Sequence, residues 1–129
     1  MDRKARAQEL RDIQERHYNC CQAVLIPFAE ELGMDHETAY RLAAHFGGGM
    51  RRQATCGAVT GALMALGLLG RGEEPIAVDF QERFRREAGA LDCGDLVQAA
   101  LDRGEEKKPS CDRLIALAVD MVEDFAREA

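Results

Sequence analysis

Apolar residues recur at helical spacing along most of this chain, and turn-forming and capping residues separate the helical segments. The segment 3–16 is charged, with large apolar side chains only at Leu10 and Ile13, which predicts a leading helix that faces solvent. The segment 20–32 is much more apolar, and Pro27 inside it predicts a kink or a break. The chain therefore begins with one surface helix and one more deeply buried helix.

The middle of the chain contains its most apolar segment. Asp35 is a candidate cap for a helix over 36–46. The segment 56–69 has apolar or small residues on every face, as expected of a central helix that its neighbours bury. Gly57 and Gly61 lie four residues apart in it, so they would let another helix pack closely.

Helical spacing continues through the last third of the chain. A helix expected over 76–90 places Phe80 and Phe84 on one face, and shorter helices are expected from Cys93 and over 111–125. No useful length alternates apolar and polar residues at the period of two that a strand requires. The pattern therefore favours helices over strands here as well.

Composition supports the same fold class. Ala, Leu, Glu and Arg are abundant, aromatic residues make up only 5%, and Trp is absent. The fold predicted is all-α: a compact single-domain bundle of about five to seven helices. The domain is expected to span 1–129, with 1–17 as a charged leading helix and 56–69 as the central helix.

Charge and hydropathy restrict the class of partner and the compartment. A net charge of −6 argues against nucleic acid as the main partner, because binding phosphates needs a basic surface. The charged first residues do not resemble a signal peptide, and the longest apolar run, 54–69, is too short for a membrane span. We therefore expect a cytoplasmic protein that does not insert into membranes. Five cysteines in a reducing compartment indicate redox or metal chemistry.

Four of the five cysteines share one local context. Each follows a residue that often caps a helix, and most of them precede a predicted helix: Asn19-Cys20, Thr55-Cys56, Asp92-Cys93 and Ser110-Cys111. A thiol in the first turn of a helix lies near free N–H groups and the positive end of the helix dipole. Its pKa is expected to fall from about 8.5 toward neutrality, which favours the thiolate that attacks disulfides or binds metals.

Cys56 has the strongest local signal of the four. The segment before it contains three glycines and two arginines, which form a candidate anion- or cofactor-binding loop: Gly47, Gly48, Gly49, Arg51 and Arg52. This loop lacks the glycine patterns of nucleotide-binding sites. Cys56 is therefore the candidate nucleophile, activated by its helix and by the two arginines.

The cysteine motifs resemble those of the C_GCAxxG_C_C family, small proteins regarded as redox-active. "NCCQAV" matches the first family cysteine at Cys20, and "CGAVTG", preceded by "FGGGM", matches the central motif at Cys56. "LDCGDL" and "SCDRL" match the third and fourth at Cys93 and Cys111. The resemblance implies a helical fold and four functional cysteines. It leaves Cys21 as an additional thiol.

The first functional hypothesis is thiol–disulfide chemistry that needs no cofactor. Cys56 would attack, and another of Cys20, Cys93 and Cys111 would resolve the mixed disulfide. The partner would be a redox protein or a small thiol. No Cys-x-x-Cys motif and no βαβ pattern occur, so the site is not of the thioredoxin type.

A second hypothesis is a metal site in which Cys20, Cys56, Cys93 and Cys111 are the ligands. An iron–sulfur cluster is preferred over zinc, because the closely spaced cysteine pairs of zinc sites are absent.

A third hypothesis is a non-catalytic helical interaction domain in which the cysteines only fill the core. We prefer thiol chemistry over both alternatives.

Overall fold

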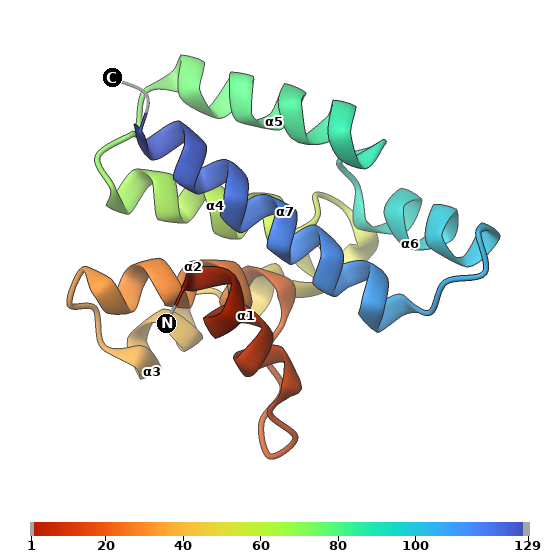
Figure 1. The fold of residues 1–129 in the computed structure, drawn as a ribbon, viewed down its shortest axis with the longest axis horizontal. Coiled ribbons are helices and arrows are strands. Elements are labelled where there is room, and N and C mark those ends of the chain that lie inside the picture. Colours follow the sequence, from red (N-terminus) through yellow and green to blue (C-terminus); the bar gives the residue numbers. More distant parts are fainter. Residues whose placement is uncertain (1, 128–129) are drawn as a thin grey trace.

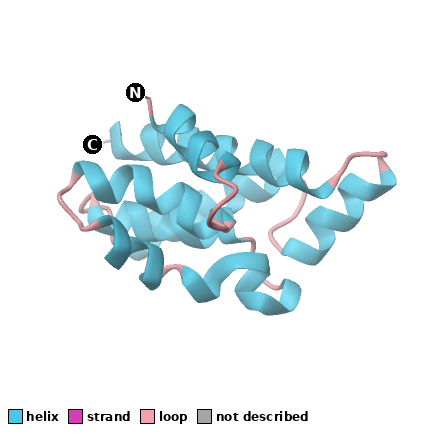
Figure 2. Cartoon of the chain, turned by 90° about the horizontal axis from the view of Figure 1, so that it is seen from below, coloured by secondary structure: helices cyan, strands magenta, loops and turns pink. Residues whose placement is uncertain are grey.

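The computed structural model describes residues 2–127, so Met1 and residues 128–129 of the predicted domain lie outside it. The described residues form an all-α fold, and Figure 2 shows helices joined by loops. The α-helices are α1 (Arg3–Asp12), α2 (Cys20–Glu31), α3 (His36–Leu42), α4 (Gly57–Leu68), α5 (Glu74–Ala88), α6 (Cys93–Asp102) and α7 (Lys107–Arg127). A 3₁₀ turn, Ala44–Phe46, and an irregular helical turn, Gly49–Gln53, connect α3 to α4. The predicted fold class is confirmed.

The core forms where α4 packs against α2 and α7 (Figure 1). Gly61 of α4 permits the close approach to α2, because a Cβ at this position would lie 2.7 Å from the backbone oxygen of Cys21. Gly57 has a similar role, since its Cβ would lie 3.0 Å from the Cys21 nitrogen. The prediction of a central helix with a glycine face is therefore confirmed, and this face packs within the chain.

Helix α2 continues through Pro27 without a break, although a kink or a break was predicted there. A proline inside a helix costs one backbone hydrogen bond and a steric clash. The residues from Cys21 to Ala29 are all buried, Pro27 among them. Burial of nearly every face of α2 offsets the local cost of the proline.

Several helix boundaries also differ from the prediction, among them the end of α3, which lies at residue 42 instead of 46. Helix α1 ends at Asp12, because Ile13 has an extended backbone. Helix α7 begins at Lys107, before the expected start at Cys111. Pro109 lies in the first turn of α7, where a missing N–H leaves no intrahelical bond unmade.

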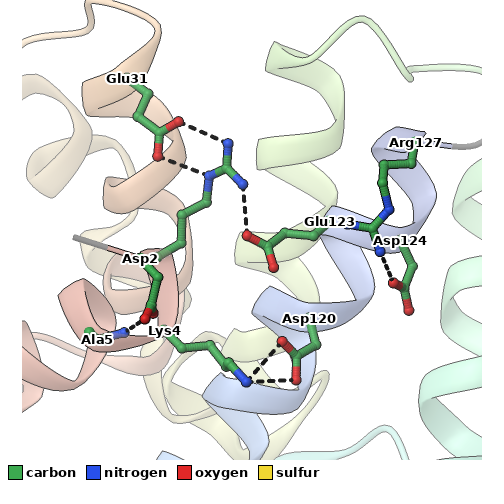
Figure 3. Close-up of polar contacts among 9 residues, drawn as sticks. Asp2, Lys4, Ala5, Glu31, Asp120, Glu123, Asp124 and Arg127 are labelled. Atoms are coloured by element: carbon green, nitrogen blue, oxygen red, sulfur yellow. Dashed lines mark hydrogen bonds and ion pairs between the residues drawn. The ribbon is translucent and has the colours of Figure 1, made fainter.

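Helix α1 is less solvent-facing than its sequence indicates. Its Ala7 and Leu10 side chains are buried against the core. The Arg3 guanidinium donates hydrogen bonds to both Glu31 of α2 and Glu123 of α7. Figure 3 shows the carboxylates of Glu31 and Glu123 directed toward one guanidinium group. Ion pairs with two helices therefore hold α1 on the bundle.

Helix α5 packs on α7 through aromatic side chains. Phe80 and Phe84 of α5 are fully buried, as predicted from their spacing, and the Phe80 ring meets Phe125 of α7 edge to face at 5.4 Å. None of the helices in residues 2–127 is long and apolar enough to cross a membrane.

Candidate functional site

All four cysteines of the predicted site line one pocket: Cys20, Cys56, Cys93 and Cys111. We call it the cysteine pocket; its volume of about 100 Å³ holds a few water molecules. Arg11 and Lys107 also line this pocket. The tertiary structure thus places four thiols and two cations together.

A capping box fixes Cys20 at the start of α2. The Asn19 side chain accepts a hydrogen bond from the Gln22 N–H at 2.8 Å, and the Gln22 side chain accepts one from the Asn19 N–H at 2.7 Å. The Asn19 amide also donates to the backbone oxygen of Ala44. Gly47 permits this arrangement, because a Cβ there would lie 2.4 Å from the Asn19 Cβ. Gly47 therefore positions Cys20 through Asn19.

A short backbone pairing brings Cys56 and Cys93 together. The Cys56 N–H donates to the oxygen of Leu91 at 2.8 Å, and the Cys93 N–H donates to the oxygen of Ala54 at 2.7 Å. These two bonds tie the start of α4 to the start of α6. Neither half of the pairing is evident from the sequence, since a two-bond contact leaves no periodic pattern.

The cysteines occupy three different positions relative to their helices. Cys20 and Cys93 are the first residues of α2 and α6, as predicted. Cys56 is itself the cap of α4, in place of Thr55. Cys111 is the fifth residue of α7 and lies outside its first turn, so the prediction of a cap at its preceding residue is wrong. The early start of α7 is the reason.

The pKa of Cys56 is raised to about 11, contrary to the prediction that it is lowered. Burial of the sulfur is the largest cause, because a thiolate loses its hydration there. The nearby backbone N–H groups of Ala58 and Val59 act in the opposite direction and are outweighed. The start of a helix alone therefore does not activate this thiol.

Cys111 has the lowered pKa of the site, about 6. Hydrogen bonding with the Cys20 thiol is the largest cause, and the positive charges of Arg11 and Lys107 add to it against the effect of burial. The same hydrogen bond raises the pKa of Cys20, which keeps its proton. The two sulfurs therefore form a pair, with a thiolate at Cys111 and a thiol at Cys20.

Arg11 connects three parts of the site. Its guanidinium donates to the Asp112 carboxylate at 2.7 Å and to the backbone oxygen of Tyr18 at 2.8 Å, and its side chain is only 10% exposed. It holds α1 against both α7 and the loop that leads into Cys20. The sequence gives no signal for this residue, because no cysteine motif lies near Arg11 in the chain.

Lys107 is the second cation that the sequence analysis missed. It stands four residues before Cys111, which puts the two residues on one face of α7. The four-residue spacing predicts that the two side chains are close only if one helix contains both residues, which requires knowing that α7 begins at Lys107.

The glycine loop has an unusual backbone. Gly48, Gly49, Met50 and Arg51 have φ values of 59°, 65°, 57° and 61°, so four consecutive residues are left-handed. Such a conformation costs about 1–2 kcal/mol for each residue other than glycine. Local contacts hold it in place: the Ala54 N–H donates to the Gly49 oxygen at 2.9 Å, and the Arg51 guanidinium donates to the Ala44 oxygen at 3.1 Å.

The residues predicted to bind an anion or cofactor have different positions. Gly48 lines the cysteine pocket. Gly49 packs so closely against Cys93 that a Cβ added at Gly49 would lie 2.8 Å from the Cys93 Cβ. Arg51 lines an adjoining groove and Arg52 is exposed. Neither arginine is among the causes of the pKa shift of Cys56. Their predicted role as its activators therefore stays a prediction without support from the pKa of Cys56.

Cys21, the thiol outside the family pattern, is also outside the cysteine pocket. Its sulfur is fully buried, lies 3.8 Å from the Met64 sulfur and has a pKa raised to about 12 by burial. This environment is that of an unreactive core residue.

Within residues 2–127, no group of three or more His, Cys, Asp or Glu side chains is arranged to hold a metal ion. The four-cysteine metal site, iron–sulfur or zinc, stays a prediction for metal analysis to test.

One family matches the chain: "Putative redox-active protein (C_GCAxxG_C_C)", over residues 18–125. No curated protein and no solved structure matches it. The matched region includes the whole cysteine pocket apart from Arg11 and His17, and it covers most of the described helices. The chain belongs to the C_GCAxxG_C_C family of redox-active proteins.

Proposed function

We propose that this protein carries out thiol–disulfide exchange with Cys20 and Cys111 as its redox pair. The observation that carries the proposal is the division of roles between two sulfurs in one pocket, a thiolate at Cys111 and a hydrogen-bonded thiol at Cys20. A nucleophilic thiolate beside a thiol that still holds its proton is the arrangement that the two steps of exchange need.

In the first step, the Cys111 thiolate attacks one sulfur of a substrate disulfide. A bond forms between Cys111 and that sulfur, and the other substrate sulfur leaves as a thiolate. In the second step, the Cys20 thiol gives up its proton and its sulfur attacks the Cys111 sulfur. The substrate leaves as a second thiolate, the Cys20–Cys111 disulfide remains, and two electrons have passed from the protein to the substrate.

Arg11 and Lys107 are positioning and electrostatic residues in this scheme. Their charges favour the Cys111 thiolate, so they stabilise the reduced protein relative to its disulfide. Cys56 does not replace Cys111 as the attacking thiol, because with a pKa of about 11 it is almost wholly protonated at neutral pH. This assignment differs from the one that the sequence alone favours.

The experiment is oxidation followed by disulfide mapping, on protein purified without oxygen and analysed for iron, sulfide and zinc. A small oxidised dithiol should produce a Cys20–Cys111 disulfide. Cys111→Ser should abolish it, and Cys21→Ser, outside the pocket, should leave it unchanged.

Three outcomes would overturn the proposal. A disulfide that instead joins Cys56 to another cysteine would reassign the pair. Stoichiometric iron and sulfide or zinc, with protected thiols, would favour the metal hypothesis. Thiols that react only on unfolding, with no metal, would favour the interaction domain.

A further inference from the structure

A groove opens beside the cysteine pocket, between the glycine loop and α6. Its volume is about 460 Å³, and it shares Gly48, Cys93, Val97 and Lys107 with the cysteine pocket. Cys20, Cys56 and Cys111 do not line it. The groove is therefore a separate space that meets the redox pair at one boundary.

The groove is positively charged although the chain is acidic. The chain has 23 acidic and 17 basic residues, yet Arg51 and Lys107 line the groove and no carboxylate of residues 2–127 does. The irregular backbone of the glycine loop directs Arg51 to this position, and Gln53 of the same loop lies against Gly94 at the start of α6. The strained turn thus forms one cationic wall.

Lys107 is free to bind a ligand, whereas the adjacent Lys108 is held in ion pairs. Lys108 binds Asp12 at 3.1 Å and Asp112 at 2.8 Å. Lys107 has no ion pair or side-chain hydrogen bond to any described residue, and it lines both the groove and the cysteine pocket. Apart from the Cys111 thiolate, whose pKa it helps to lower, its charge has no partner among the described residues at the boundary between the two.

We propose that this groove binds a small disulfide or thiol that carries carboxylate groups. Lys107 and Arg51 contact the carboxylates, and the sulfur of the ligand lies at the Cys93 boundary, toward Cys111. The volume lies within the range of about 300–1,000 Å³ typical of small-molecule sites. The exchange step rests on the proposed function, whereas binding of the anion does not.

The first test compares three disulfides of different charge: oxidised glutathione, 2-hydroxyethyl disulfide and cystamine, which are negative, neutral and positive. The negative disulfide should oxidise the protein about tenfold faster than the neutral one, because a cationic groove concentrates anions. Lys107→Met should remove most of this preference, and the matched control Lys108→Met should retain it. Lys107 also affects the thiolate at Cys111, but that effect is common to all three disulfides and cancels in the ratio.

Arg51→Met is a second variant, because Arg51 lines the groove and is not among the causes of the pKa shift of Cys111. It should lower the rate with oxidised glutathione several-fold and leave the rate with 2-hydroxyethyl disulfide unchanged. Rates that are independent of substrate charge in all variants would overturn the proposal while leaving thiol exchange intact.

The second test measures binding without exchange. S-methylglutathione has carboxylates and no exchangeable sulfur, so it should protect Cys93 from alkylation, and Lys107→Met should weaken this protection. Protection without any disulfide exchange would mean that the groove exists and the proposed function fails. No protection of Cys93 at millimolar concentration would overturn the groove itself.

Discussion

Two buried cysteines, Cys56 at the start of α4 and Cys111 near the start of α7, have pKa values shifted in opposite directions. Cys56 caps its helix and lies near the backbone N–H groups of Ala58 and Val59, yet burial raises its pKa to about 11. Cys111 lies beyond the first turn of its helix, yet its pKa is lowered to about 6. Both side chains are almost fully buried, at 4% and 8% exposure, so accessibility does not separate them.

The difference lies in what surrounds each sulfur. Cys111 interacts with a thiol donor and two cationic side chains, and Cys56 has no cation among the causes of its shift. Partial charges at a helix end are weaker than full charges, and they do not offset the loss of water around a buried thiolate. Position on a helix is therefore a weaker determinant of thiol reactivity here than the side chains that the fold supplies.

The largest expected effect is on alkylation. At pH 7 the thiolate fraction of Cys111 exceeds that of Cys56 by roughly 10⁴, and the lower intrinsic nucleophilicity of the more acidic thiolate reduces the advantage to roughly 100-fold. Iodoacetamide labelling, resolved by mass spectrometry, measures both rates. The rate at Cys111 should have an inflection near its pKa of about 6. Equal rates at the two sites would remove the distinction drawn above.

The next effect concerns the packing that fixes the start of α4. Gly61→Ala should lower the free energy of unfolding by about 1–3 kcal/mol, because the added Cβ is forced against the α2 backbone. Gly67→Ala, in the same helix, is the matched control: its Cβ meets nothing within 4 Å, and it should gain up to about 1 kcal/mol from helix propensity. Urea unfolding measures both. A neutral Gly61→Ala would show that α4 does not depend on this contact.

A smaller effect is the pH dependence of stability, with opposite signs for the two thiols. Between pH 6 and about 8.5 the unfolded chain keeps the Cys111 proton that the folded chain has lost, so stability from this group rises with pH. Between about 8.5 and 11 the folded chain keeps the Cys56 proton, so stability from that group falls. Each slope is at most about 1.4 kcal/mol per pH unit.

Thermal unfolding across pH checks these slopes in two variants. Cys111→Ser should flatten the lower range, and Cys56→Ala should reduce the slope in the upper range, to which Cys20 and Cys21 also contribute. The reverse pattern would mean that the assignment of the thiolate is wrong.

Most of the fold follows from local sequence. The period that predicted α5 is a period of core-facing residues, and the apolar segments that predicted α2 and α4 are mostly buried. The caps Asn19 and Asp35 act where expected. Helix α2 continues through Pro27 because the burial of its residues offsets the cost of the proline. Helix α7 begins before its predicted start because Pro109 lies in the first turn, where a proline is tolerated.

The sequence by itself determined the fold class and the family, since helical periodicity and motif spacing are properties of neighbouring residues. Only the tertiary structure decided which sulfur is the thiolate. That choice depends on Arg11, which contacts a residue 101 positions away, and on the hydrogen bond between Cys20 and Cys111. Charge and dehydration act through a few ångströms of space, and the separation of residues along the chain does not encode those distances.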